Sequence, residues 1–211
     1  MSDNFIFSSG SVTSGHPDKL CDQVSDAIVD QFLLNDKHSR VVAECAASSG
    51  VMFISAHFAS KAHLDVAEIA RRVIRDVGYP ADVFNADTCT IMTSLQDHTA
   101  TGYQPVNVRK LKNAEIDQIT SKHQVSVFGY ACDQTPELIP LPIWLAHRIT
   151  HRMDSKKVKK KLPYLLPDGK AQVGIEYRDG KPHRIHSITL VASHTQEIAP
   201  DLKRLHKDLA K

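Results

Sequence analysis

Two apolar segments, residues 40–47 and 51–59, lie on either side of Gly50, and this arrangement constrains the fold more than any other feature of the chain. Glycine suits a tight turn, so the two segments are predicted to form a β-hairpin. An amphipathic helix over residues 64–77 and a strand over residues 88–95 follow. A hairpin, a helix and a strand in this order indicate an α+β fold, with helices on one face of a mixed or antiparallel sheet.

A polar loop leads into the first helix of the chain. The loop follows a short apolar strand at residues 5–7, and the helix is expected over residues 17–34 because apolar residues recur there at helical spacing. Ser14 and Gly15 are suitable N-cap residues, and Pro17 suits the first helical turn. Free N–H groups and the positive end of the helix dipole gather at such a position and attract anions.

The side chains at this helix start combine an imidazole, an acid and a base. They belong to His16, Asp18 and Lys19. At an anion-attracting helix end, these groups suggest polyphosphate chemistry assisted by a metal ion. An ordinary capped surface helix is the alternative, since nearly every helix begins with a cap.

The rest of the chain adds a long loop and a basic run. Residues 96–124 are polar and weakly periodic, which is typical of a lid or an interface, and a helical turn is expected near residues 114–119. The run Lys156–Lys161 is interpreted as a solvated loop, with a phosphate- or nucleic-acid-contacting patch as the alternative. The remaining predicted elements are a strand at 125–131, a helix at 142–153, a turn at 165–170, strands at 171–178 and 183–191, and a helix at 197–211.

The bulk properties limit the class of protein. The 211 residues allow one large domain or two small ones, and we expect subdomains at residues 1–125 and 126–211, where the strand at residues 5–7 can pack with the second. A net charge of +2 does not argue for a nucleic-acid partner. The four cysteines form no CxxC pair and no apolar run has membrane-spanning length, so a cytoplasmic protein with reduced thiols is expected.

Six motifs stand one after another along nearly the whole chain. They are Ser11–Lys19, Arg40–Glu44, Phe128–Ala131, Pro140–Ile143, Ala146–Arg148 and Leu162–Val173. This set resembles the S-adenosylmethionine synthetases (methionine adenosyltransferases), whose ATP motif is similar to the first of these stretches. The resemblance implies two of the three α+β subdomains of that family, and tight dimers with active sites between subunits.

The family reaction joins the sulfur of methionine to C5′ of ATP and expels the triphosphate, with magnesium and potassium assisting. By this resemblance, His16 would steady charge on the leaving oxygen, Lys19 would stand near the phosphates, and Asp18 would bind magnesium. By the same resemblance, the family's nucleotide-binding positions are matched by Pro17, Asp168 and Lys170. Its potassium-site acid is matched by Glu44.

The chain also departs from the family. Its residues correspond to the family's N-terminal half, whereas the other half carries a phosphate loop, two catalytic lysines, an arginine and a second metal-binding aspartate. Within the matched half, the family has an acid at Gly10, a methionine-binding glutamate at His57, a glutamine at His98 and an aspartate at His123. A histidine cannot replace the contact between a carboxylate and the amino group of methionine.

These three histidines suggest a second hypothesis for the altered methionine pocket. Three imidazoles suit zinc or a similar transition metal, so His57, His98 and His123 could form a new metal site. Drift after the loss of methionine binding would produce the same pattern.

We expect a subunit that supplies the ATP and phosphate half of a methionine adenosyltransferase-type site, inactive alone and completed by a synthetase-like chain in a homo- or hetero-oligomer. One alternative is a non-catalytic structural or regulatory paralogue that binds a synthetase. Another is an enzyme that uses ATP or S-adenosylmethionine with an altered substrate. A nucleic-acid partner is not supported, because the basic run Lys156–Lys161 has no interleaved aromatic residues.

Overall fold

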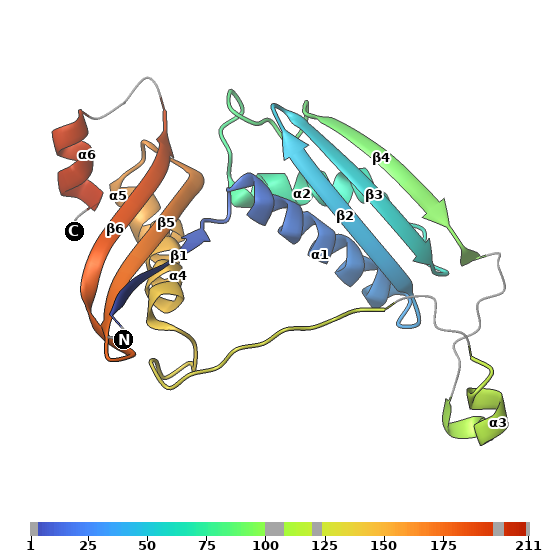
Figure 1. Ribbon diagram of the computed structural model, residues 1–211. Helices are drawn as coiled ribbons and strands as arrows, with labels where there is room; N and C mark the ends of the chain where they lie inside the picture. Colours follow the sequence, from blue (N-terminus) through green and yellow to red (C-terminus); the bar gives the residue numbers. More distant parts are fainter. Residues whose placement is uncertain (1–3, 100–107, 120–123, 196–200, 210–211) are drawn as a thin grey trace.

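The computed structural model describes residues 4–99, 108–119, 124–195 and 201–209, which form two lobes (Figure 1). Each lobe is a three-stranded sheet with helices on one face, which confirms the predicted α+β class. The elements in chain order are β1 Phe5–Val12, α1 Pro17–Asn35, β2 Arg40–Ser48, β3 Val51–Ala59, α2 Val66–Val77, β4 Thr90–Asp97, η2 Val108–Lys110, α3 Asn113–Ile116, α4 Leu141–Asp154, α5 Lys156–Lys161, β5 Leu165–Arg178, β6 Lys181–His194 and α6 Leu202–Leu209.

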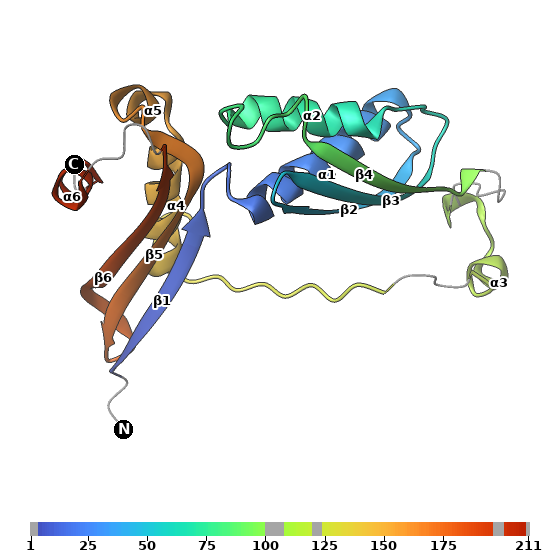
Figure 2. The ribbon, with the colours of Figure 1, turned by 90° about the horizontal axis from the view of Figure 1, so that it is seen from above.

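The N-terminal lobe is built on the sheet β2-β3-β4. Strands β2 and β3 form the predicted hairpin, closed by Ser49 and Gly50, which have φ values of 48° and 80°. Strand β4 pairs parallel to β3 after the crossover through α2, so the sheet is mixed. Helices α1 and α2 cover the same face of this sheet (Figure 2), and their apolar sides pack on Met52 and Ile54 of β3 to form the core.

The C-terminal lobe is built on the antiparallel sheet β1-β5-β6. Strand β1, the first of the chain, lies beside β5, with Phe5 opposite Tyr177 and Val12 opposite Lys170. Ala146 of α4 is buried against this sheet with Val173 and Ile175 of β5. The chain therefore begins in the C-terminal lobe, crosses into the N-terminal lobe and later returns.

Residues 13–16 join the two lobes. The backbone N–H of Thr13 donates to the carbonyl of Gly169 at 2.9 Å, and that of Gly15 donates to the carbonyl of Pro167 at 3.2 Å. A Cβ atom on Gly15 would lie 2.3 Å from Cβ of Pro167 and 2.6 Å from its carbonyl carbon. Only glycine allows the loop to approach β5 this closely.

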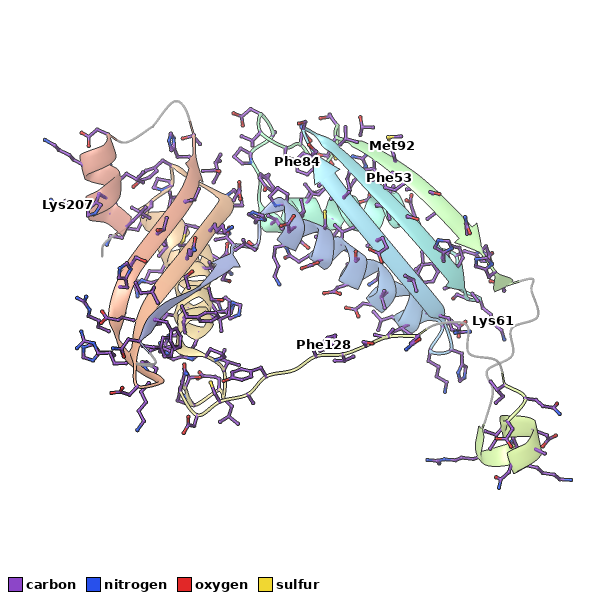
Figure 3. The ribbon with its side chains drawn as sticks, in the orientation of Figure 1. Phe53, Lys61, Phe84, Met92, Phe128 and Lys207 are labelled. Atoms are coloured by element: carbon purple, nitrogen blue, oxygen red, sulfur yellow. The ribbon has the colours of Figure 1, made fainter. Side chains whose placement is uncertain are left out.

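The prediction of a strand at residues 125–131 is wrong. Among the described residues this segment pairs with no strand, and it runs as an extended connection between the lobes (Figures 1 and 2). Its apolar side chains lie in solvent, with Val127 88% and Phe128 93% exposed (Figure 3). Aromatic and β-branched residues favour an extended backbone, but a strand also needs a neighbouring strand with which to pair.

Two further expectations are corrected. Lys156–Lys161 is the helix α5 rather than a loop, because Ser155 caps it by accepting a hydrogen bond from the N–H of Val158, and lysine favours helices. Residues 165–170 belong to β5 rather than to a turn. The β5–β6 register shifts between Leu165 and Gly169, and such an irregularity accommodates Pro167, which has no N–H to donate.

Of the two remaining predicted helices, only the last, at 197–211, lies partly outside the described residues. Within the long polar loop, the helical turn expected near residues 114–119 is found as α3, one residue earlier than predicted. The last helix, predicted at 197–211, is found as α6. Among the described residues, no helix combines the length and the apolar character that crossing a bilayer requires.

The chain exposes far more surface than a compact monomer. Its accessible surface is 14857 Å², whereas a compact protein of this mass exposes about 9,700 Å². Part of the excess is apolar: on the face of sheet β2-β3-β4 opposite to the helices, Phe53 and Met92 are in register and are 43% and 55% exposed (Figure 3). Such surface is typical of contacts with another protein.

Replacing Gly15 with alanine is expected to lower the free energy of unfolding by about 2 kcal/mol or more, because the added methyl group overlaps the backbone of Pro167. Urea denaturation monitored by circular dichroism measures the change. Gly129→Ala is the matched control, since a Cβ there would meet no atom within 4 Å. Equal stabilities of the two variants would contradict the close contact between the junction and β5.

Candidate functional site

The start of α1 differs from the prediction in one respect. The N-cap residue is His16 rather than Ser14 or Gly15, and Nδ1 of its ring accepts a hydrogen bond from the N–H of Asp18 at 3.3 Å. Pro17 occupies the first helical turn, as predicted. The imidazole is thus fixed at the end of α1, where the free N–H groups of the first turn gather.

Thr13 fastens the loop to the C-terminal lobe. Its buried Oγ1 lies within hydrogen-bond distance of two carbonyl oxygens of β5, 2.6 Å from that of Pro167 and 3.1 Å from that of Gly169. The residues that alternate with these two on β5 are Asp168 and Lys170. The loop is fastened to this part of β5, and His16 and Asp18 follow closely after Thr13 in the chain. The start of α1 is therefore tethered to the stretch of β5 that carries Asp168 and Lys170.

Ser14 is held from both lobes. Its N–H and its Oγ donate to the two carboxylate oxygens of Asp154, at 2.8 Å and 2.9 Å. Asp154 is the last residue of α4, and it also forms an ion pair with Lys159 of α5 at 3.6 Å. The carbonyl of Ser14 accepts a hydrogen bond from Nε2 of Gln23 in α1, at 2.8 Å.

Tyr79 holds the next residue of the loop from the side of the N-terminal lobe. It follows the left-handed C-cap Gly78 of α2, and its phenol O–H donates to the carbonyl of Gly15. Burial, and to a smaller degree the charge of Asp168, raises the pKa of Tyr79 to about 12.

Asp168 and Lys19 each interact with a further residue of the C-terminal lobe. Oδ2 of Asp168 accepts a hydrogen bond from Oγ of Ser193 at 3.2 Å. Burial, together with the charges of His151 and Lys19, lowers the pKa of His147. Nδ1 of His147 is 2.9 Å from Oγ of Ser11, so α4 also contacts the end of β1 that leads into the loop.

Glu44 lies apart from this constellation. It is exposed on β2 opposite Ser55, whereas the adjacent Cys45 faces α1 and accepts a hydrogen bond from Ser25 at 3.3 Å. Because neighbouring residues of a strand point to opposite faces, Glu44 lies on the face away from α1. Within one chain, Glu44 and Asp18 therefore occupy opposite sides of the sheet.

The histidines of the altered pocket are brought together in part. The rings of His57 and His98 stack with centroids 5.9 Å apart and an interplanar angle of 5°, and the N–H of His98 donates to the carbonyl of Phe58. His123 lies outside the described residues. In the part of the chain that the structure describes, no three potential ligands gather as a metal site requires. The three-histidine site stays a prediction.

The carboxylate of Asp18 could serve as a ligand for a cation beside the loop. Its side chain is 89% exposed, and its carboxylate lies 3.7 Å from Nδ1 of His16. Hard cations such as magnesium bind carboxylate oxygens and water together, which suits an exposed carboxylate. Gly10 lies on β1, which pairs with β5. A Cβ on Gly10 would lie 3.7 Å from Cε of Lys170, so an acid at this position, as the family resemblance implies, would stand beside that lysine.

Sequence reasoning missed Tyr79 and Asp154. Both act on the loop from residues far away in the chain, and neither belongs to a motif. The only local signal was the glycine before Tyr79, which ends α2 and directs the chain toward the loop.

Comparison with known proteins identifies the class of protein. Residues 4–100 match the N-terminal domain of S-adenosylmethionine synthetase, and residues 118–211 match its central domain. The chain belongs to the S-adenosylmethionine synthetase family.

Individual relatives agree with this assignment. The chain is 45% identical over 205 residues to the S-adenosylmethionine synthase of Rippkaea orientalis, and 42% identical over 205 residues to that of Trichodesmium erythraeum. It is 43% identical over 202 residues to a synthase of Prochlorococcus marinus. Each match covers 94% of this chain and 49% of the relative, so the chain spans about half the length of these proteins.

The Tyr79→Phe variant should alter the stability of the protein at high pH. The folded state raises the pKa of Tyr79 from 10 to about 12, so the neutral phenol is favoured in the fold. This stabilisation is complete below pH 10 and is lost as the pH rises through 12. The wild type should therefore lose more unfolding free energy across this interval than Tyr79→Phe does.

Urea denaturation at a series of alkaline pH values measures this difference, and phenolate absorbance follows the titration. Tyr130→Phe, at an exposed tyrosine, is the control. Identical pH profiles for the wild type and Tyr79→Phe would show that the phenol is not held as described.

Proposed function

We propose that this chain supplies the ATP and phosphate half of a methionine adenosyltransferase-type site, and that a partner chain completes the site. The observation that carries the proposal is the loop of residues 13–16, which is fastened to β5 by Thr13 and to the N-terminal lobe by Tyr79. The loop presents the start of α1 next to the segment of β5 that holds two residues matching nucleotide-binding positions.

The roles follow from the chemistry of each group. His16 is fixed as the N-cap of α1 and donates to phosphate oxygens through its ring, stabilising the charge that develops on the leaving triphosphate. Lys19 balances phosphate charge from the same helix end, and Asp18 is the residue that would hold magnesium. Asp168 and Lys170 contact the nucleotide from β5. When bound, magnesium neutralises phosphate charge and orients the chain of phosphates.

Exposed apolar surface supports completion by another chain. Phe53 and Met92 on the sheet, and Val127 and Phe128 on the connection between the lobes, lie in solvent. The catalytic lysines and the phosphate loop that the family reaction needs are not among these 211 residues. The partner is a synthetase-like chain, which supplies them while covering this surface. Potassium would then bind at Glu44, on the sheet face that meets the partner.

A second candidate function is that of a non-catalytic regulatory subunit that binds a synthetase. The stacked rings of His57 and His98 favour it, because the family uses a glutamate at the first of these positions to hold the amino group of methionine. Two imidazoles supply no negative charge for that group. In this role the nucleotide end would still bind ATP, without catalysis. An enzyme that uses ATP would instead need a substrate other than methionine.

Isothermal titration of ATP with magnesium tests the nucleotide half. The wild-type chain should bind ATP, and His16→Ala should weaken binding roughly 10- to 100-fold, since a hydrogen bond to a charged group contributes about 1.5–3 kcal/mol. His183→Ala, at an exposed position on β6, is the matched control and should bind like the wild type. Absence of ATP binding by the wild type, with and without magnesium, would refute the proposed nucleotide site.

The exposed sheet face should mediate assembly. Sedimentation velocity of the wild type is expected to show an oligomer, and Phe53→Glu combined with Met92→Glu should shift it toward the monomer, because buried charges oppose association. Leu34→Glu, at an exposed apolar residue near the end of α1, is the control and should leave the oligomer intact. A wild-type monomer with the same profile as the double variant would contradict assembly through this face.

A further inference from the structure

We propose that Asp154 is a positioning residue for the nucleotide loop, acting through Ser14; this role rests on the proposed nucleotide function. Asp154 ends α4, in the C-terminal lobe, and its hydrogen bonds and its ion pair join it to Ser14 and Lys159, which are not residues assigned to the nucleotide. Its effect on ATP is therefore expected to come entirely from where it holds the loop.

The geometry is that of a two-point clamp. The N–H of Ser14 donates to Oδ2 of Asp154 at 2.8 Å, and Oγ of Ser14 donates to Oδ1 at 2.9 Å. Two hydrogen bonds to one carboxylate fix the orientation of the donor as well as its distance. The backbone of Ser14 can therefore neither rotate nor withdraw from α4 without losing a bond to a charged group.

The clamp reaches the helix start through consecutive contacts. The carbonyl of Ser14 accepts from Nε2 of Gln23 in α1 at 2.8 Å, so α1 is tied to the clamped residue. The carbonyl of Thr13 accepts from the N–H of His16 at 3.1 Å, which closes a turn around Ser14. Fixing Ser14 thus fixes the turn that ends at His16, the residue that caps α1.

Asp154 lies between two helices. It is the last residue of α4, whose negative dipole end disfavours a carboxylate, and it directly precedes Ser155, the N-cap of α5, whose N-terminal end favours one. The hydrogen bonds from Ser14 and the ion pair with Lys159, at 3.6 Å, hold the carboxylate in this position.

The clamp directs Oγ of Ser14 toward α4. This Oγ donates to Asp154, while His16, the residue directly before the first residue of α1, caps the helix. The imidazole thus occupies the capping position, at the anion-attracting end of α1.

Titration of ATP with magnesium into five proteins tests the role: the wild type, Ser14→Ala, Asp154→Ala, Asp154→Asn and the double variant Ser14→Ala with Asp154→Ala. Asp154→Ala should weaken ATP binding roughly tenfold, the loss of a hydrogen bond to a charged group. Asp154→Asn should stay within about threefold of the wild type, because an amide oxygen accepts from the Ser14 N–H and an amide N–H can donate to Oγ. The double variant Ser14→Ala with Asp154→Ala should be no weaker than Asp154→Ala alone.

Asp36→Ala is the matched control for stability. The Asp36 carboxylate also accepts two backbone N–H groups, those of His38 and Lys61, each at 3.0 Å, at the far end of α1. Asp36→Ala should therefore destabilise the fold in a comparable way but leave ATP binding unchanged. Equal ATP affinity of Asp154→Ala and the wild type, or equal weakening in Asp36→Ala, would overturn the positioning role.

Hydrogen exchange separates this role from the proposed function. The amides of residues 14–16 and of Asp18 should lose protection in Asp154→Ala and keep it in Asp154→Asn, whether or not ATP binds. A wild type that binds no ATP but shows this exchange pattern would refute the nucleotide function and retain the clamp. Unchanged protection in Asp154→Ala would refute the clamp. If Asp154→Ala does not fold, Ser14→Ala must lose both protection and affinity, and retention of either overturns the proposal.

Discussion

The close approach of Gly15 to β5 is the constraint on which the rest of the molecule depends. The chain starts in one sheet and passes into the other through this loop, so the contact with Pro167 is also where the two lobes meet. Thr13 on one side and Tyr79 on the other hold the same few residues. A side chain at Gly15 would separate the two lobes and would also disrupt the candidate site, because both depend on the same piece of backbone.

The fold was predictable where local sequence sets local structure. The hairpin at Gly50 and the helix α1 were predicted to within about a residue, since turn propensity and helical periodicity are properties of short windows. The segment at 125–131 was not, because pairing depends on an edge strand elsewhere in the molecule. Likewise, the cap of α1 is His16 rather than Ser14 or Gly15, and Ser14 instead contacts a residue 140 positions away.

The candidate site divides in the same manner. His16, Asp18 and Lys19 could be selected from their position at a helix start, and Asp168 and Lys170 from their resemblance to a family motif. The side chains that hold the loop could not, since a tyrosine after a helix and an aspartate at a helix end are ordinary in sequence. Only the fold shows that Tyr79 and Asp154 reach the same loop from opposite lobes.

The extended connection between the lobes has a consequence for the life of the chain in a cell. Proteases bind their substrates as extended backbone, and residues 124–131 offer such a segment, with Val127 and Phe128 in water. The connection between the lobes is therefore the segment at which proteolysis of an uncovered copy is expected to begin.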